Sequence, residues 1–303
     1  MQNETTKATV VYQSSDLPSG VKIHYASAGF SSAPHVLLLH GYPSSANQYR
    51  KLIPILAKDY YVVAPDLPGF GLTTTPSGYQ HTFENMASVI CEFLSHQNII
   101  KTAVYIFDYG APTAFRIALA RPDLFSAIIT QNGNAFEEGL GPFWDPLKAW
   151  WKTGDKYDQI RSTLRDVVGD IESTKHQYYD GVPTNLVDRI DPSAYTLDYL
   201  QNLLSDDKRE IQLDLFWDYQ NNIKLYPEFQ RWMLEKQVPI LAVWGKNDPI
   251  FIPPGAEAFA KARETNGADK VEVVLLDGGH FLLETHLEEV SERIHRFLQL
   301  HAL

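Results

Sequence analysis

Two aspartates and a histidine occur in this sequence in an order that could support nucleophilic catalysis. Asp108, Asp248 and His280 each follow a short apolar run closely, and His280 ends a Gly-Gly-His turn. A histidine paired with a carboxylate can deprotonate water, and a second carboxylate opposite it can bond covalently to a substrate. The chain order nucleophile, acid, histidine therefore predicts a hydrolytic site.

Asp108 lies where a strand is expected to turn into a helix. Thr102–Phe107 has the composition of a buried strand, and the helical stretch Ala111–Ala120 follows after Gly110. Such a strand–turn–helix lifts the residue at the turn clear of the sheet, as in a nucleophile elbow. Ile106 departs from this pattern, because a small residue usually stands there. An aspartate at this place can also simply cap the helix, but similar signals at other strand ends favour the nucleophile.

A glycine turn after another expected strand predicts an oxyanion hole. The turn reads His40-Gly41-Tyr42-Pro43. The backbone N–H of Tyr42 and that of Tyr109, which follows Asp108, would form its two donors. We expect His40 to lie at the substrate pocket and to shape this loop by hydrogen bonding rather than to transfer a proton.

Apolar runs alternate with helix-like segments, which predicts a mostly parallel central sheet flanked by helices. The expected strands are Val21–Ser27, His35–Leu39, Tyr60–Ala64, Thr102–Phe107, Ala127–Thr130, Val238–Trp244 and Val271–Leu276, and Leu287–Leu300 is expected to be an amphipathic helix. Between residues 134 and 236 the chain is rich in Trp, Tyr and Asp and has helical periodicity. We expect a core formed by residues 1–133 and 237–303, with residues 134–236 as a helical cap over the sheet edge at which ligands bind.

The sequence resembles the α/β-hydrolase superfamily over essentially its whole length. Within it, the chain is similar to the epoxide hydrolase and haloalkane dehalogenase branch, whose nucleophile is an aspartate. His40-Gly41-Tyr42-Pro43 matches the HGxP motif of that branch, and Asp66-Leu-Pro-Gly-Phe-Gly71 matches its loop after the next strand. The resemblance implies the α/β-hydrolase fold, with Asp108 as nucleophile, His280 as base and Asp248 as the acid that orients it.

Some dehalogenases carry this acid after a different strand. The corresponding turn here, residues 131–134, reads Gln-Asn-Gly-Asn and has no carboxylate, so Asp248 keeps the role. A carboxylate nucleophile suits displacement of a leaving group from a saturated carbon. The expected substrate is therefore a small, apolar, electrophilic molecule, either an epoxide or an alkyl halide.

The leaving group depends on side chains expected in the cap. Related epoxide hydrolases open the ring with tyrosine hydroxyls, and Tyr219 lies late in the cap, where one such tyrosine is expected. Trp150 and Trp151 lie near the position of the other, and we assign both to the substrate pocket. Either could donate an indole N–H to a halide, as cap tryptophans do in dehalogenases, although those enzymes usually have tryptophan where this chain has Tyr109. We expect an epoxide hydrolase, with a haloalkane dehalogenase as the alternative and a non-catalytic ligand-binding protein as the second.

Composition limits the remaining possibilities. The 303 residues carry a net charge of −11, which disfavours nucleic acid and anionic membranes as partners, because both require a basic face. The single cysteine, Cys91, cannot form an internal disulfide, and we expect neither a metal nor an organic cofactor, because the sequence contains no ligand cluster and no phosphate-binding loop. The N-terminal segment lacks a secretory signal, so we expect a cytoplasmic protein, either a monomer or a homodimer.

Overall fold

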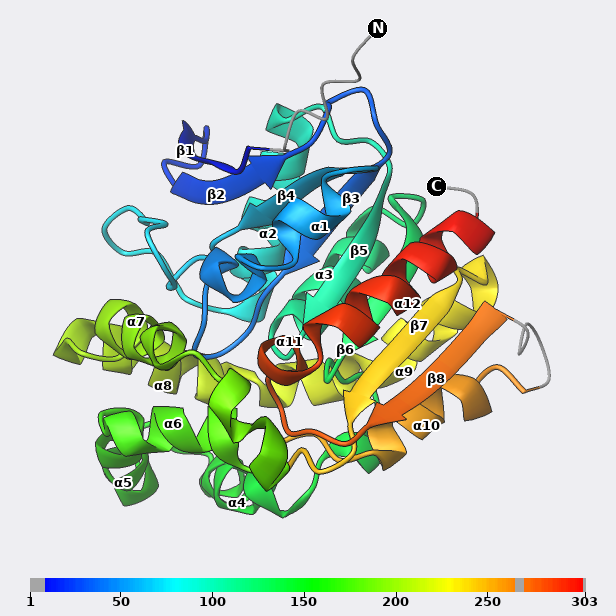
Figure 1. Ribbon diagram of the computed structural model, residues 1–303. Coiled ribbons are helices and arrows are strands. Elements are labelled where there is room, and N and C mark those ends of the chain that lie inside the picture. The colour runs from blue at the N-terminus through cyan, green and yellow to red at the C-terminus, as the bar shows by residue number, and fades with distance from the viewer. Residues whose placement is uncertain (1–8, 265–269, 302–303) are drawn as a thin grey trace, which may run out of the picture.

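An eight-stranded sheet forms the centre of the protein in the computed structural model, which describes residues 9–264 and 270–301 (Figure 1). The strand order is β1-β2-β4-β3-β5-β6-β7-β8. The strands are β1 (Val11–Asp16), β2 (Lys22–Ala28), β3 (His35–Leu39), β4 (Tyr61–Pro65), β5 (Thr102–Phe107), β6 (Phe125–Gln131), β7 (Ile240–Gly245) and β8 (Val271–Leu276). Strand β2 is antiparallel to β1 and β4, and every other pair is parallel. The prediction of a mostly parallel sheet is confirmed.

Every strand that the sequence predicts is present, within two residues at either end. The sequence analysis missed β1, whose residues Val-Tyr-Gln-Ser-Ser-Asp are nearly all exposed. Among the described residues it pairs only with β2 and lies at the edge of the sheet. Because it lacks a buried face, its sequence shows no alternation of apolar and polar residues.

Helices cover both faces of the sheet. One face packs against α2 (Phe83–His96), α3 (Gly110–Ala120), α9 (Gln220–Lys236) and α10 (Pro254–Lys261), and the other against α1 (Ile53–Leu56) and α12 (Leu287–Leu300). Side chains of β3 alternate between the two cores: Leu37 and Leu39 lie in the first, Val36 and Leu38 in the second. This period of two is what a strand buried on both sides requires.

The segment between β6 and β7 is helical. It contains the short helices η2 (Glu137–Gly139), η3 (Pro142–Trp144) and η4 (Thr184–Arg189), and α4 (Asp145–Thr153), α5 (Gln159–Val168), α6 (Ile171–Tyr179), α7 (Pro192–Asn202) and α8 (Asp206–Asp218), which group together at one end of the sheet (Figure 1). We call α4 to α8 the cap. Helix α9, which the sequence analysis grouped with them, packs instead against α3, where Phe229 stacks on Phe115 at 5.3 Å.

Three aspartates and a serine begin four helices of the cap. Asp158, Asp170, Asp191 and Ser205 are the N-caps of α5, α6, α7 and α8, and each side chain accepts a backbone N–H of the first turn. These acceptors satisfy donors that a helix start otherwise leaves unpaired.

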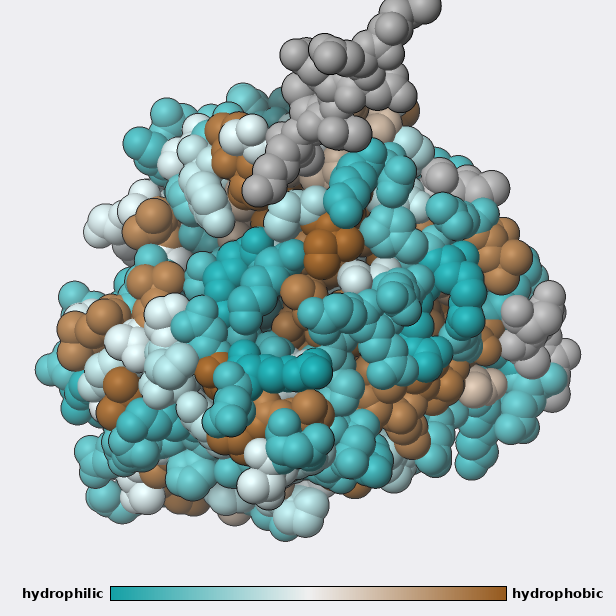
Figure 2. All heavy atoms as spheres, in the orientation of Figure 1, coloured by the Kyte–Doolittle hydropathy of each residue, from teal (hydrophilic) through white to brown (hydrophobic). Residues whose placement is uncertain are grey.

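The face of the molecule seen in Figure 2 is largely hydrophilic, and its apolar side chains form separate patches. Among the described residues, no helix is long and apolar enough to cross a membrane. The prediction about a secretory signal concerns the first nine residues, and residues 1–8 lie outside the described part of the chain.

We expect Gly110→Ala to lower the free energy of unfolding by about 3 kcal/mol, the upper end of the usual cost of overpacking. A Cβ at this position would lie 2.1 Å from the carbonyl oxygen of Leu39, so α3 would have to move away from β3. Urea denaturation followed by circular dichroism measures the loss. Gly154→Ala is the control, since its Cβ would meet nothing within 4 Å, and it should cost only about 1 kcal/mol for its left-handed backbone. Equal losses would show that the contact with β3 is not responsible.

Candidate active site

Asp108 sits at a sharp turn between β5 and α3. Its φ is +46°, in the left-handed region that a non-glycine residue rarely adopts. The neighbouring chain comes so close that a Cβ on Gly41 would lie 2.2 Å from Asp108 Oδ1. A side chain at either Gly41 or Gly110 would push the surrounding backbone away from this turn. The local geometry therefore presents the Asp108 carboxylate to the loop that follows β3.

Two backbone N–H groups stabilise this carboxylate. The N–H of Tyr42 donates to Asp108 Oδ1 at 2.6 Å, and the N–H of Tyr109 also hydrogen-bonds to the carboxylate. These are the two donors that the sequence predicted. Oδ2 is on the side of His280.

His280 lies between the two aspartates. Its Nδ1 is 2.8 Å from Asp248 Oδ2, and its Nε2 is 3.9 Å from Asp108 Oδ2. Nε2 is buried and has no hydrogen-bond partner among the described residues. The structure thus brings together the three residues that the sequence singled out, with the imidazole edge turned toward the carboxylate of Asp108.

Asn132 helps to hold Asp248, and the sequence analysis did not identify it. Asn132 Nδ2 donates to Asp248 Oδ2 at 2.6 Å, while the N–H of Ile250 donates to Oδ1 at 2.7 Å. Gln131 Nε2 donates both to Asn132 Oδ1 and to the carbonyl oxygen of His280. The sequence signal for Asn132 is the run of polar side chains directly after β6, on the same sheet edge as Asp108.

The pKa values reflect this arrangement. Burial raises the pKa of Asp108 to about 6, although His280 and the N–H groups of Tyr42 and Tyr109 lower it. Burial alone would lower the pKa of His280, but the charge and hydrogen bond of Asp248, with Asp108, raise it overall. At neutral pH most Asp108 carboxyls are therefore ionised, as a nucleophile must be.

Two buried tyrosine hydroxyls lie next to each other near this site. The ring of Tyr219 packs 4.4 Å from that of Trp144 and 5.9 Å from that of Tyr109, and its hydroxyl is 3.1 Å from the hydroxyl of Tyr226. Burial raises the pKa of both tyrosines, and the charge of Asp108 raises both further. Both therefore keep their protons at neutral pH. Tyr226, on α9, was not predicted.

Three residues assigned to the substrate pocket from the sequence have other contacts. His40 Nε2 accepts the N–H of Leu67 at 2.9 Å and Nδ1 donates to the carbonyl oxygen of Gly41, so His40 fastens the loop. The indole N–H of Trp150 donates to the carbonyl oxygen of Asp155, and that of Trp151 to the carbonyl oxygen of Phe216. The interpretation of these two indoles as free halide donors is therefore wrong.

A cavity of about 540 Å³ lies between the cap and the core. Its wall is mostly apolar and includes Phe143, Leu147, Leu164, Phe216 and Ile250. Tyr42 also lines it, and its backbone N–H is the donor to Asp108. The cavity thus adjoins the carboxylate through Tyr42, whose ring lies 5.0 Å from that of Phe216.

Residues 34–287 match the model of the alpha/beta hydrolase fold family. The chain belongs to this family. An uncharacterized hydrolase of Saccharomyces cerevisiae, YNR064C, is 46% identical over 276 residues, which cover 91% of this hydrolase and 92% of the relative. A haloalkane dehalogenase of Psychrobacter cryohalolentis is 25% identical, covering 92% of this hydrolase and 88% of the relative.

Solved structures show the same fold. Haloalkane dehalogenase DbeA from Bradyrhizobium elkani superposes with a TM-score of 0.77 at 19% identity, covering 97% of this hydrolase and 99% of that chain. Epoxide hydrolase CorEH superposes with a TM-score of 0.71 at 21% identity, covering 96% of this hydrolase and 99% of that chain. The α/β-hydrolase fold and the resemblance to the epoxide hydrolase and haloalkane dehalogenase branch are confirmed.

We expect Asp108→Asn to be more stable than the wild type at pH 7 by roughly 2–3 kcal/mol. The carboxyl has a pKa of about 6 in the folded hydrolase, against 3.8 for an unperturbed group, so the unfolded chain loses its proton first as the pH rises. The stability of the wild type relative to the variant should therefore fall between about pH 4 and pH 6 and stay low above it. Urea denaturation from pH 4 to pH 8 measures this. A difference that does not change with pH would contradict the raised pKa.

Proposed function

We propose that this hydrolase forms a covalent alkyl ester on Asp108 and opens epoxides to diols. The observation that carries the proposal is the placement of His280 Nε2, which lies 3.9 Å from Asp108 Oδ2 and has no hydrogen-bond partner in the described part of the chain, while Asp248 holds Nδ1. This imidazole can take a proton from water beside the carboxyl that carries the ester.

In the first step, Asp108 attacks a saturated carbon of the epoxide. Tyr42 and Tyr109 donate to the carboxylate, with Tyr42 on Oδ1, so Oδ2 is the oxygen that forms the new C–O bond. The ring C–O bond breaks, and its electron pair goes to the epoxide oxygen. That oxygen takes a proton from the hydroxyl of Tyr219, which the neighbouring hydroxyl of Tyr226 orients.

In the second step, water hydrolyses the ester. His280 takes a proton from water, and the resulting hydroxide attacks the carboxyl carbon of Asp108. The negative charge then develops on the oxygen that faces Tyr42 and Tyr109, and losing one such donor typically costs about 3–4 kcal/mol. Asp248 stabilises the imidazolium. As the intermediate collapses, the ester C–O bond breaks and the leaving alkoxide takes the proton of the Asp108 carboxyl, which releases the diol and restores the carboxylate. The proton of the imidazolium returns through solvent to the Tyr219 oxygen and restores its hydroxyl.

The polar side chains around Asp108 favour an epoxide over a halide. An epoxide oxygen needs a proton donor, and the protonated pair Tyr219 and Tyr226 supplies one. A halide needs free N–H donors, but the indoles of Trp144, Trp150 and Trp151 all donate to backbone carbonyls. Dehalogenation is the second candidate, because a haloalkane dehalogenase matches this chain over most of its length.

The cavity indicates a neutral, apolar substrate of medium size. A volume of about 540 Å³ is within the usual range of small-molecule sites. Its mostly apolar wall would not compensate a charged group for the loss of water. Aliphatic and aryl epoxides meet both conditions.

The variant His280→Gln should accumulate an alkyl ester on Asp108, because the first step remains possible while the base for the second is lost. Mass spectrometry of the peptide containing Asp108 would show an increase equal to the mass of the epoxide. Asp108→Asn is the control and should remain unmodified. If His280→Gln stays unmodified with every substrate that the wild type turns over, the covalent mechanism is wrong.

Tyr219→Phe should slow epoxide opening by about 100-fold or more, the usual contribution of a positioned general acid, while affecting halide displacement much less. The measurement uses terminal epoxides and 1-haloalkanes of increasing chain length, with diol and free halide quantified separately. An equal loss for both substrate classes would remove the acid role of Tyr219. Halide release without diol formation would establish the dehalogenase instead, and no turnover of either class would favour a ligand-binding protein.

A further inference from the structure

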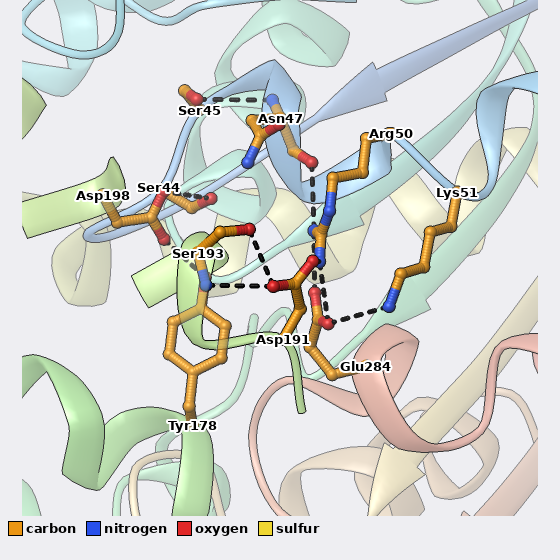
Figure 3. Close-up of polar contacts among 10 residues, drawn as sticks. All are labelled: Ser44, Ser45, Asn47, Arg50, Lys51, Tyr178, Asp191, Ser193, Asp198 and Glu284. Carbon is orange, nitrogen blue, oxygen red and sulfur yellow. Dashed lines mark hydrogen bonds and ion pairs between the residues drawn. The ribbon is translucent and has the colours of Figure 1, made fainter. Parts of the chain in front are cut away.

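A buried carboxylate on the cap lies outside the mechanism described above. Asp198, on α7, has no exposed surface. Its Oδ2 accepts the hydroxyl of Tyr178, on α6, at 2.5 Å, and its Oδ1 accepts the hydroxyl of Ser44, in the core, at 3.2 Å (Figure 3). A buried carboxylate is costly unless it is well hydrogen-bonded, so this group depends on both of its donors.

The contact with Ser44 leads to the loop that supplies the oxyanion hole. Ser44 lies two residues after Tyr42, and its N–H donates to the carbonyl oxygen of Gly41 at 2.9 Å. Asn202, one turn after Asp198 on α7, donates to the carbonyl oxygens of Pro43 and Ser44. Helix α7 therefore holds residues 43 and 44 by three side-chain hydrogen bonds, directly beside the N–H that binds Asp108.

The contact with Tyr178 leads to the loop that carries His280. The ring of Tyr178 stacks on Phe281, with centroids 3.9 Å apart and planes 8° apart. Phe281 follows His280 in the chain, and their rings are 5.4 Å apart. The chain after α6 also presses on this loop, because a Cβ on Gly279 would lie 2.1 Å from the carbonyl oxygen of Asp180.

We propose that Asp198 is a positioning residue that locks the cap onto the two loops that carry the Tyr42 N–H and His280. The inference rests on the proposed function, in which both groups act when the ester is hydrolysed. Without Asp198, Ser44 and Tyr178 would lose their shared acceptor, and both loops could shift relative to Asp108. Misplacement of catalytic groups by about 1 Å can cost roughly 100-fold in rate.

The charges around Asp198 give it a distinct pH behaviour. Burial raises the pKa of Asp198 to about 7, opposed by the hydrogen bonds from Tyr178 and Ser44 and by the charge of Arg50, while Glu284 raises it further. Arg50 is itself bound by both oxygens of Glu284, at 2.8 and 2.9 Å (Figure 3). A proton on Asp198 would compete with one of the two hydroxyl donors, so the lock should be fully formed only above neutral pH.

The test compares Asp198→Ala, Ser44→Ala and Asp198→Asn with the wild type, using 1,2-epoxyoctane as substrate. We expect kcat to fall by about 10- to 100-fold in Asp198→Ala and by about 10-fold in Ser44→Ala. KM should stay the same or fall, and alkyl ester should accumulate on Asp108, because the second step has become slower. Asp198→Asn keeps the shape but, like the protonated carboxyl, has only one acceptor for the two hydroxyls. Its kcat should therefore lie between those of the wild type and Asp198→Ala and should fall less steeply on the acid side.

Asp191→Asn is the matched control. Asp191 belongs to the same polar cluster, where it binds Arg50 and caps α7, but within the described part of the chain it makes no hydrogen bond with Ser44 or Tyr178. Asparagine preserves the cap, so this variant should behave as the wild type. If Asp198→Ala fails to fold, Ser44→Ala tests the same inference, because it removes only one hydrogen bond to Asp198 and should also lower kcat.

Several outcomes would overturn the inference. The first is a raised KM with unchanged kcat, which would indicate a loosened pocket. The second is wild-type kinetics in both Asp198→Ala and Ser44→Ala. The third is a loss of kcat in Asp191→Asn equal to that in Asp198→Ala. The His280→Gln variant is measured in parallel. If it forms the ester while Asp198→Ala and Ser44→Ala behave as the wild type, only the role of Asp198 is wrong. If it forms none, the proposed function fails first.

Discussion

The site depends on keeping one carboxylate ionised where water barely reaches it. The side chain of Asp108 is only 5% exposed, and burial by itself favours the protonated form. The N–H groups of Tyr42 and Tyr109 and the imidazole of His280 counteract this. These groups come from the ends of β3, β5 and β8, so the parallel sheet, which gathers its carboxyl ends at one edge, is what brings them together.

The same requirement explains local features that look unfavourable in isolation. A left-handed φ at an aspartate costs of order 1–3 kcal/mol and persists only when the surroundings enforce it. Here Gly41 and Gly110 let the loop after β3 and the start of α3 approach the turn within distances that no side chain would allow. The strained backbone at Asp108 thus lowers the stability of the fold slightly, and it directs the carboxylate toward the N–H groups of Tyr42 and Tyr109.

Much of this arrangement could be predicted from the sequence because it follows from strand ends. Buried strands appear as apolar runs, and polar residues directly after them must share one edge of a parallel sheet, as Asp108, Asp248 and His280 do. The cap tryptophans could not be predicted in the same way. The packing of α4 against α8 turns the N–H of Trp151 toward the carbonyl oxygen of Phe216, and the turn after α4 places the carbonyl oxygen of Asp155 at the N–H of Trp150. Tyr226 could not be predicted because the sequence does not show that its hydroxyl meets that of Tyr219. Asn132 lies in the polar turn after β6, but an amide that only supports Asp248 has no signature of its own in the sequence.

The cap is inserted at one point of the chain, between β6 and β7, yet its helices reach back to loops near both ends of the sequence. Through Asp198 and Asn202 it contacts residues 43 and 44, and through Tyr178 it contacts Phe281. A chimaera that received the cap of a relative would therefore have a different pocket wall. It would also have different contacts to the loops that carry the Tyr42 N–H and His280. Exchanging α4 and α5 alone would keep the contacts of α6 and α7 with these loops. This half of the cap is therefore the part to exchange when only substrate choice is to change.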